Sequence, residues 1–302
     1  MSETLESRVA ASLSQDVRPE VRRIAENLGH ETGALAVLFY GSNLRTGSLE
    51  GVLDFYVLLP GPQAERIWPR VSYREWDADG QTLRAKIATM SLTQFHEAAQ
   101  GRSLDTTIWA RFVQPSALAW SRNVEAAGEV RKAVVSAART AARLATALGP
   151  ERGTAQDFWR ALFQATYRAE FRIERPGRED SILSVNEAHF AGLLPLAWKA
   201  DGIDFTVHDA VLSPRLSPRV RAGILRWWNR RRRVGKPLNL LRLGKATTTF
   251  EGAADYGAWK LERHTGIRLE VTDFRARHPL LAAPGALFEL WLARREQARN
   301  QR

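Results

Sequence analysis

The strongest constraint on this chain is a short segment in which two apolar runs flank a glycine-serine turn and a carboxylate. The first run covers residues 34–40 and ends at Gly41 and Ser42, and Asp54 stands at the head of the second run, Phe55–Leu59. Two apolar runs of this length, separated by turn residues, predict two neighbouring β-strands. A carboxylate between apolar residues is costly to bury unless it has a partner or a metal ion. Asp54 is therefore the first candidate for a functional residue.

The turn and the carboxylate suit one kind of chemistry. Small residues at a turn let backbone N–H groups approach a triphosphate, and a serine hydroxyl can donate to a phosphate oxygen. A carboxylate on the adjacent strand can hold the Mg²⁺ ion that neutralises charge as pyrophosphate leaves. This layout resembles the nucleotidyltransferase superfamily of the polymerase beta type. In the alternative interpretation, Gly41 only ends a strand and Asp54 pairs with an arginine.

The segment departs from the superfamily pattern at one position. That pattern has two carboxylates flanking one residue, and here Val52 stands where the first would be, with Asp54 in the second place. Either the metal is held differently or the site is inactive. The sequence does not choose among the other acids that are near enough to complete a metal site: Glu50, Glu75, Asp77 and Asp79.

Length and periodicity predict an α+β fold. With 302 residues the chain exceeds the usual single-domain size. We expect a nucleotidyltransferase-like domain with a mixed sheet and helices over residues 1–122, followed by a mainly helical region over residues 123–302. Its 44% apolar content and ten tryptophans are ample for a packed core.

The apolar spacing also predicts individual elements. One helix or two short ones are expected over residues 5–28. Residues 70–76 and 82–90 predict a second pair of strands, joined by a hairpin turn at residues 77–80. From residue 92 onward the pattern is helical. Further helices are expected over residues 125–148 and 154–171, followed by a polar connector at 176–180. Helical stretches are then expected through residue 198 and over residues 217–233.

Several classes of protein are excluded or disfavoured. There is no cysteine, so the chain can form neither a disulfide nor a thiolate metal site. The histidines lack metal-binding spacing, and no nucleophile elbow, Walker loop or dinucleotide fingerprint is present. No window approaches the roughly 18–20 apolar residues of a transmembrane segment, and the first residues do not form a signal peptide. We expect a cytoplasmic protein, free or peripheral on the inner face of the membrane.

Three cations are candidates for binding phosphate groups. Arg84 and Lys86 are two residues apart on the expected fourth strand, so both point to one face of the sheet. If that face also carries Asp54, they would be aimed at a triphosphate. Otherwise they form a solvated edge that resists aggregation. Arg111 lies among large apolar residues and would contact phosphate or substrate, or pair with Asp54 or Asp105.

A basic segment in the second half of the chain suits a polyanionic partner. The net charge is +11, and residues 221–245 hold nine basic side chains and no acid. Trp227 and Trp228 stand beside the run Arg230–Arg233, a pattern that suits an anionic membrane surface or single-stranded nucleic acid. The same pattern is typical of a solvated helix whose tryptophans lie in the core.

Four short motifs carry a resemblance to a known family. They are Phe39-Tyr40-Gly41-Ser42, Leu53-Asp54-Phe55, Lys86 five residues before Ser91, and Arg111 four residues before Pro115. They resemble the motifs Tyr-Gly-Ser, Asp-Phe, Lys-Tyr-Gly-Val-Ile-Ser and Gly-Arg-Leu-Gln-Lys-Pro of the mitochondrial-type CDP-diacylglycerol synthases, the translocator assembly and maintenance family. That family also lacks the usual carboxylate pair.

The match is incomplete. It covers roughly residues 35–120 at the level of motifs. Ala85, Ala88 and Thr89 break the lysine motif, and Gln114 is displaced by one residue from the glutamine of the family. The identity of the substrate is therefore less strongly indicated than nucleotidyl transfer.

The resemblance implies a peripheral membrane enzyme that joins CTP, or another nucleoside triphosphate, to phosphatidic acid with Mg²⁺ and releases pyrophosphate. The expected roles are catalytic for Asp54, Lys86 and Arg111, nucleotide-binding for Gly41, Ser42, Arg45 and Arg84, and metal-binding for Asp54. Two alternatives stay open. One is a nucleotidyltransferase that acts on RNA or a small molecule, and the other is a non-catalytic protein that binds nucleotides or anionic lipid through a degenerate site.

Overall fold

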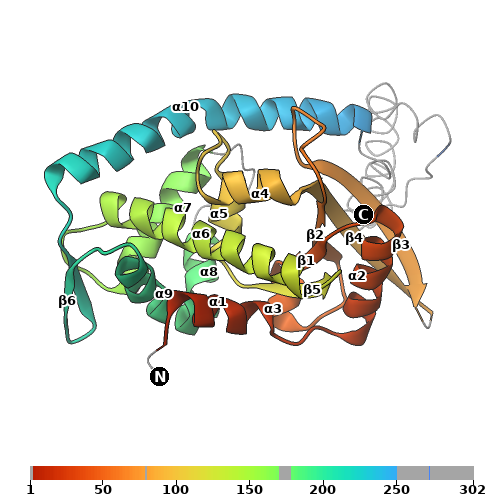
Figure 1. Ribbon diagram of the computed structural model, residues 1–302, viewed down its shortest axis with the longest axis horizontal. Coiled ribbons are helices and arrows are strands. Elements are labelled where there is room, and N and C mark those ends of the chain that lie inside the picture. The colour runs from red at the N-terminus through yellow and green to blue at the C-terminus, as the bar shows by residue number, and fades with distance from the viewer. Residues whose placement is uncertain (1–2, 79, 170–177, 250–271, 273–302) are drawn as a thin grey trace, which may run out of the picture.

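A mixed five-stranded sheet organises the molecule. The structure is a computed structural model that describes residues 3–78, 80–169, 178–249 and 272. The strands of this sheet are β1 (Ala36–Tyr40), β2 (Val52–Leu59), β3 (Arg70–Ala78), β4 (Gln81–Ser91) and β5 (Ser116–Ser121). Their order is β3-β4-β2-β1-β5, with β2 and β4 parallel and the other neighbours antiparallel (Figure 1). The chain is therefore an α+β protein, as the sequence predicts.

Helices precede, interrupt and follow this sheet. The first are α1 (Leu5–Leu13) and α2 (Pro19–Thr32), so the expected helical stretch over residues 5–28 is a pair. Those between strands are α3 (Ser42–Thr46), α4 (Leu92–Ala99) and α5 (Thr107–Phe112). The later elements are α6 (Val124–Leu148), α7 (Ala155–Ala169), α8 (Arg178–Val185), α9 (Glu187–Ala200), the hairpin of β6 (Phe205–His208) and β7 (Val211–Pro214), and α10 (Pro218–Thr249).

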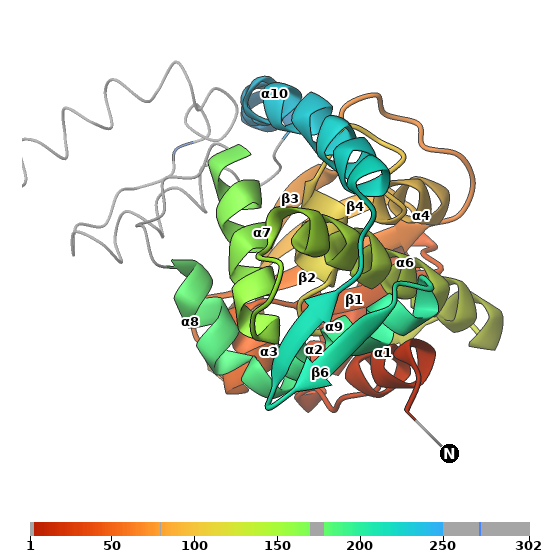
Figure 2. The same cartoon turned by 90° about the vertical axis from the view of Figure 1, so that its left-hand side faces the viewer.

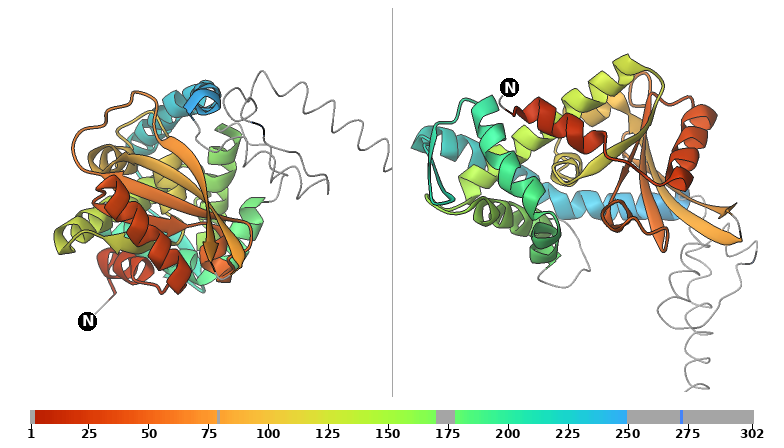
Figure 3. Two further views of the ribbon diagram at one scale, coloured as in Figure 1. Left: turned by 90° about the vertical axis from the view of Figure 1, so that its right-hand side faces the viewer. Right: turned by 90° about the horizontal axis from the view of Figure 1, so that it is seen from below.

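The two faces of the sheet are covered differently because side chains alternate along each strand. Leu53, Phe55 and Val57 of β2 are buried against α2, whose apolar positions repeat at helical spacing. The opposite face carries Tyr56 and Leu58, which are buried with the helices that follow β4. Figure 3 shows α2 alone beside one face of the sheet and the larger group of helices on the other side.

Some of the predicted boundaries are confirmed and others are wrong. The hairpin of β3 and β4 is confirmed, and β2 begins at Val52, so Asp54 lies inside the strand. The expectation that the chain is helical after residue 92 is wrong for β5, β6 and β7. β5 escapes the pattern because alanine, a strong helix former, supplies two of its three buried positions.

Other differences concern the second half. α8 begins at Arg178, which overlaps the expected connector at 176–180, and α10 continues to Thr249 rather than ending at Arg233. Residues 170–171, expected at the end of a helix, lie outside the described residues, as do residues 176–177. The expected boundary between residues 122 and 123 falls between β5 and α6, and the division into domains stays a prediction. Side chains from both sides of it share one hydrophobic cluster.

α10 runs along the length of the molecule (Figures 1 and 2). Trp228 is buried in the core, and Trp227 donates a hydrogen bond from Nε1 to the carbonyl oxygen of Gly101 at 3.1 Å. The guanidinium of Arg231 lies 3.9 Å from the Trp227 ring centroid, and its Nε donates to the carbonyl oxygen of Ser103 at 3.1 Å. Both tryptophans therefore have a structural role. Within the described residues, no helix combines the length and apolar character that crossing a bilayer requires.

We expect the substitution Gly29→Ala in α2 to destabilise the protein by about 1–3 kcal/mol. A Cβ atom at Gly29 would lie 2.4 Å from the indole ring of Trp120, which is closer than packing allows. Urea unfolding measures the change. The matched control is Gly128→Ala in α6, where a Cβ meets nothing within 4 Å and the fold should gain about 0.5–1 kcal/mol. Equal stability of the Gly29 variant and the wild type would contradict the packing of α2 on β5.

Candidate functional site

The register of the central strands brings the first candidate side chains together. β2 lies between β1 and β4, and Asp54 is directly opposite Tyr40 on one side and Lys86 on the other. Residues paired across neighbouring strands point to the same face of a sheet. Asp54 and Lys86 therefore share the face that the large group of helices covers. The sequence left open whether Lys86 shares a face of the sheet with Asp54, and the register shows that it does.

The turn after β1 lies next to the carboxylate of Asp54. Gly41 has a φ of +92°, a conformation that favours glycine. A Cβ atom at this position would lie 3.0 Å from Oδ2 of Asp54. The loop beyond is held by Asn43, whose Nδ2 donates to the carbonyl oxygens of Ser48 at 2.9 Å and Glu50 at 2.7 Å. Gly41 thus allows the carboxylate to lie close to the turn.

Arg111 reaches the same place from α5. Its Nη1 donates to the hydroxyl oxygen of Tyr56 at 3.3 Å, and its guanidinium lies 5.2 Å from the ring centroid of Tyr40. Asp105, one of the partners considered for Arg111, accepts a hydrogen bond from Nη1 of Arg242 at 2.6 Å. The two tyrosines place the guanidinium over the sheet face that carries Asp54.

A polar cavity of about 210 Å³ unites these groups. The residues that line it are Tyr40, Gly41, Ser42, Arg45, Asp54, Lys86, Arg111, Gln114, Pro115, Tyr167 and Ile182. Six of the seven site residues expected from the sequence are among them. The seventh, Arg84, does not line this cavity, and its Nε donates to Oε1 of Glu75 on β3 at 3.2 Å.

The electrostatics of the cavity favour an anion. Burial raises the pKa of Asp54 above its usual value of 3.8, and the charges of Lys86 and Arg111 offset part of this shift. Burial also raises the pKa of Tyr40 well above its usual range, so that hydroxyl is neutral at neutral pH. Arg45, Lys86 and Arg111 are three cations against the single carboxylate in the lining. Their excess of positive charge suits phosphate groups.

The second carboxylate that the superfamily pattern would require has no evident substitute. Glu50, Glu75 and Asp77 do not line the cavity, and Asp79 lies outside the described residues. The carboxylate of Glu75 accepts hydrogen bonds from Tyr73 at 2.7 Å and from Arg84. Within the described ranges, no group of three histidine, cysteine, aspartate or glutamate side chains could hold a metal ion. Asp54 is thus the one acidic side chain that the described lining offers.

Two lining residues come from helices far along the chain. Tyr167 lies on α7 and Ile182 on α8, and both contribute to the cavity. Nothing in the local pattern of either helix distinguishes these positions from core residues, so they could not be found from the sequence. In the sequence, Gln114 and Pro115 stand out only as parts of a motif.

Comparison with known proteins adds no assignment to this geometry. Neither the models of known protein families nor the curated proteins contain a match to the chain.

We expect Asp54→Asn to raise the melting temperature of the ligand-free protein at pH 7. Because the pKa of Asp54 is raised in the folded state, ionisation costs stability as the pH rises through the interval between the unfolded and folded pKa values. Above that interval the full cost is present, and asparagine removes it. Differential scanning fluorimetry measures the two proteins between about pH 3 and pH 8.

The gain should disappear at the acid end, where Asp54 is protonated in both states. Asp77→Asn is the control, since Asp77 is an exposed residue of β3 that does not line the cavity. A lower melting temperature of Asp54→Asn at pH 7 would show that the charge pairs with Lys86 and Arg111 outweigh the cost of burial.

Proposed function

We propose that the protein is a nucleotidyltransferase that transfers CMP from CTP to the phosphate of phosphatidic acid, giving CDP-diacylglycerol and pyrophosphate. One observation carries the proposal: three cations, one carboxylate and a glycine-serine turn line a single polar cavity. The antiparallel pair of β1 and β2, with the turn after β1 and the carboxylate on β2, supports the nucleotidyltransferase fold. The motif resemblance supports the choice of CTP and phosphatidic acid.

The residues of the cavity have distinct tasks in this reaction. Arg45, Lys86 and Arg111 bind the triphosphate and neutralise the charge that develops on the departing pyrophosphate. The Gly41-Ser42 turn offers backbone N–H groups and a hydroxyl to the phosphate oxygens. Tyr56 and Tyr40 hold the guanidinium of Arg111 in place. Binding energy is thus directed to the phosphates.

The acceptor needs little acid–base chemistry. The phosphate of phosphatidic acid is already an anion, so it needs a fixed position and relief of charge repulsion rather than deprotonation. This agrees with a lining in which the described residues include three cations and no histidine. Apolar Ile182 and the ring of Tyr167, at the side of the cavity formed by α7 and α8, would contact the less polar part of the acceptor.

The donor set fits Mg²⁺ that is shared with a substrate. Mg²⁺ usually keeps several waters and is bound through one or two carboxylates plus substrate phosphates, so Asp54 alone is a sufficient protein ligand. The lack of a Cβ at Gly41 leaves Oδ2 of Asp54 next to the turn where phosphates would lie. When bound, the ion would neutralise charge on the phosphate oxygens.

The exposed face of α10 is suited to the surface where such an acceptor resides. It carries a set of basic side chains: Arg219, Arg226, Arg230, Arg232, Arg233 and Lys236. Basic residues near an anionic bilayer contribute about 1 kcal/mol each. We propose that this face holds the protein on an anionic membrane.

Incubation of the pure protein with labelled CTP, Mg²⁺ and phosphatidic acid in liposomes should yield CDP-diacylglycerol. Asp54→Asn should lower kcat/KM at least about 100-fold, because it removes the proposed metal ligand and leaves the other lining groups in place. Asp77→Asn is the control, with activity expected at the wild-type level. The lipid product is separated by thin-layer chromatography.

The other outcomes distinguish the alternatives. Transfer of label to RNA or to a small alcohol, but not to phosphatidic acid, would reassign the acceptor. Binding of labelled CTP without turnover on any acceptor would indicate a non-catalytic protein. Full activity of the Asp54 variant would refute the role of the carboxylate.

A further inference from the structure

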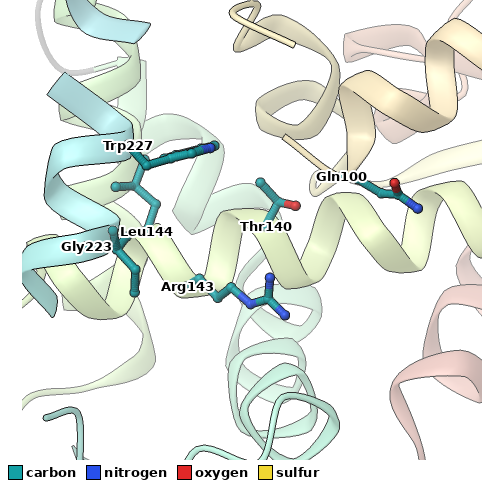
Figure 4. A pocket seen from close by; sticks show the side chains of 7 residues that line it. Gln100, Thr140, Arg143, Leu144, Gly223 and Trp227 are labelled. Atoms are coloured by element: carbon teal, nitrogen blue, oxygen red, sulfur yellow. The ribbon is translucent and has the colours of Figure 1, made fainter. Parts of the chain in front are cut away.

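A second depression lies between α6, α10 and the end of α4, and none of its described lining residues belongs to the cavity around Asp54. Figure 4 shows its two ends. Leu144 and Trp227 lie at one end, whereas Thr140, Gln100 and the guanidinium of Arg143 lie toward the other. We call this depression the α6–α10 groove. Its polarity changes along its length, from apolar to cationic.

The apolar end is a rigid wall. Leu144, Ile224 and Trp227 line this end of the groove, whose whole volume is about 240 Å³. The indole of Trp227 is fixed by its hydrogen bond to Gly101 and by the guanidinium of Arg231 on its ring. An apolar surface that is already in place loses little conformational entropy when a ligand binds.

The cationic end has more positive than negative charge. An adjoining depression of about 270 Å³ shares Gln100, Thr140 and Arg143 with the groove, and it is also lined by Arg102 and Arg139. Arg139 and Arg143 both donate to the carboxylate of Asp201, at 2.5 Å and 2.9 Å. Two guanidiniums thus share one carboxylate. Arg102 donates to the carboxylate of Glu97 at 2.7 Å. Three guanidiniums therefore meet two carboxylates, and one positive charge is left over.

We propose that the α6–α10 groove binds a small amphipathic anion, with an apolar chain against Leu144, Ile224 and Trp227 and one acidic group at Arg143. Pockets for drug-sized ligands enclose roughly 300–1,000 Å³. A groove of about 240 Å³ therefore suits a smaller ligand, such as one with a single short alkyl chain. The excess guanidinium charge selects an acidic head group over a neutral or cationic one, because a charge-assisted hydrogen bond is stronger than a neutral one.

One glycine allows the groove to be filled without disturbing its walls. A Cβ atom at Gly223 of α10 would meet nothing within 4 Å, so a larger side chain there would extend into open space. Gly223→Phe should occupy the apolar end and remain folded, since phenylalanine has a higher helix propensity than glycine. Gly128→Phe in α6 is the matched control. It is the same substitution at a helical glycine with equally open space, outside the groove.

Isothermal titration calorimetry with decanoate tests the proposal. The wild-type protein should bind decanoate saturably with one site per chain. Decanol and decyltrimethylammonium should bind about tenfold more weakly or worse, because neither can accept hydrogen bonds from Arg143 as an anion does. Gly223→Phe should abolish binding, and Gly128→Phe should leave it unchanged.

Two further arms separate this groove from the cavity of the proposed reaction. Asp54→Asn should retain wild-type affinity for decanoate, since Asp54 is not in the groove. Arg143→Gln should weaken decanoate binding about tenfold and leave decanol binding unchanged. Absence of saturable binding to the wild type, equal binding of decanol and decanoate, or unchanged binding to Gly223→Phe would each overturn the proposal.

Discussion

The polar cavity around Asp54 depends on the register of β2 between its two neighbours. Asp54 faces Tyr40 and Lys86 because the strands pair as they do, and Leu53 and Phe55 on either side of it are fully buried against the layer that includes α2. A shift of one residue would turn every side chain of β2 to the opposite face. It would bury Asp54 beneath α2 and place two large apolar side chains among the cations. The apolar packing on one face therefore fixes the chemistry on the other.

This arrangement has a cost to folding that the charges only partly offset. Desolvation works against the ionised form of Asp54, and the nearby Lys86 and Arg111 favour it. Arg111 is itself held against the aromatic rings of Tyr40 and Tyr56, where a cation gains from the faces of the rings. In the proposed reaction, the phosphates of the substrate would balance the excess positive charge of Arg45, Lys86 and Arg111.

The sequence was sufficient for local features and insufficient for features that depend on packing. The strands around Gly41 and Asp54 could be predicted because two apolar runs and a turn are local signals. Because Arg84 and Lys86 share one face of β4, the sequence pattern could not show that only Lys86 lines the cavity. In the structure Glu75 lies opposite Arg84 because the turn is tighter than the predicted turn at residues 77–80, with Ala78 and Gln81 as its first pair. In contrast, Tyr167 and Ile182 reach the cavity through the packing of α7 and α8, for which the sequence carries no local sign.

The basic helix shows why a run of charges cannot be interpreted from composition alone. Arg231 donates to carbonyl oxygens of the segment that follows α4, and Arg242 pairs with the buried carboxylate of Asp105 just before α5. These two arginines therefore hold the segment from which α5 carries Arg111 to the cavity. Their neighbours Arg230, Arg232 and Arg233 are exposed on the surface. Substitution of every basic residue of α10 would confound the two roles, because loss of Arg231 and Arg242 would disturb the position of Arg111 as well as the charge of the surface. Only the exposed positions can report on a polyanionic partner.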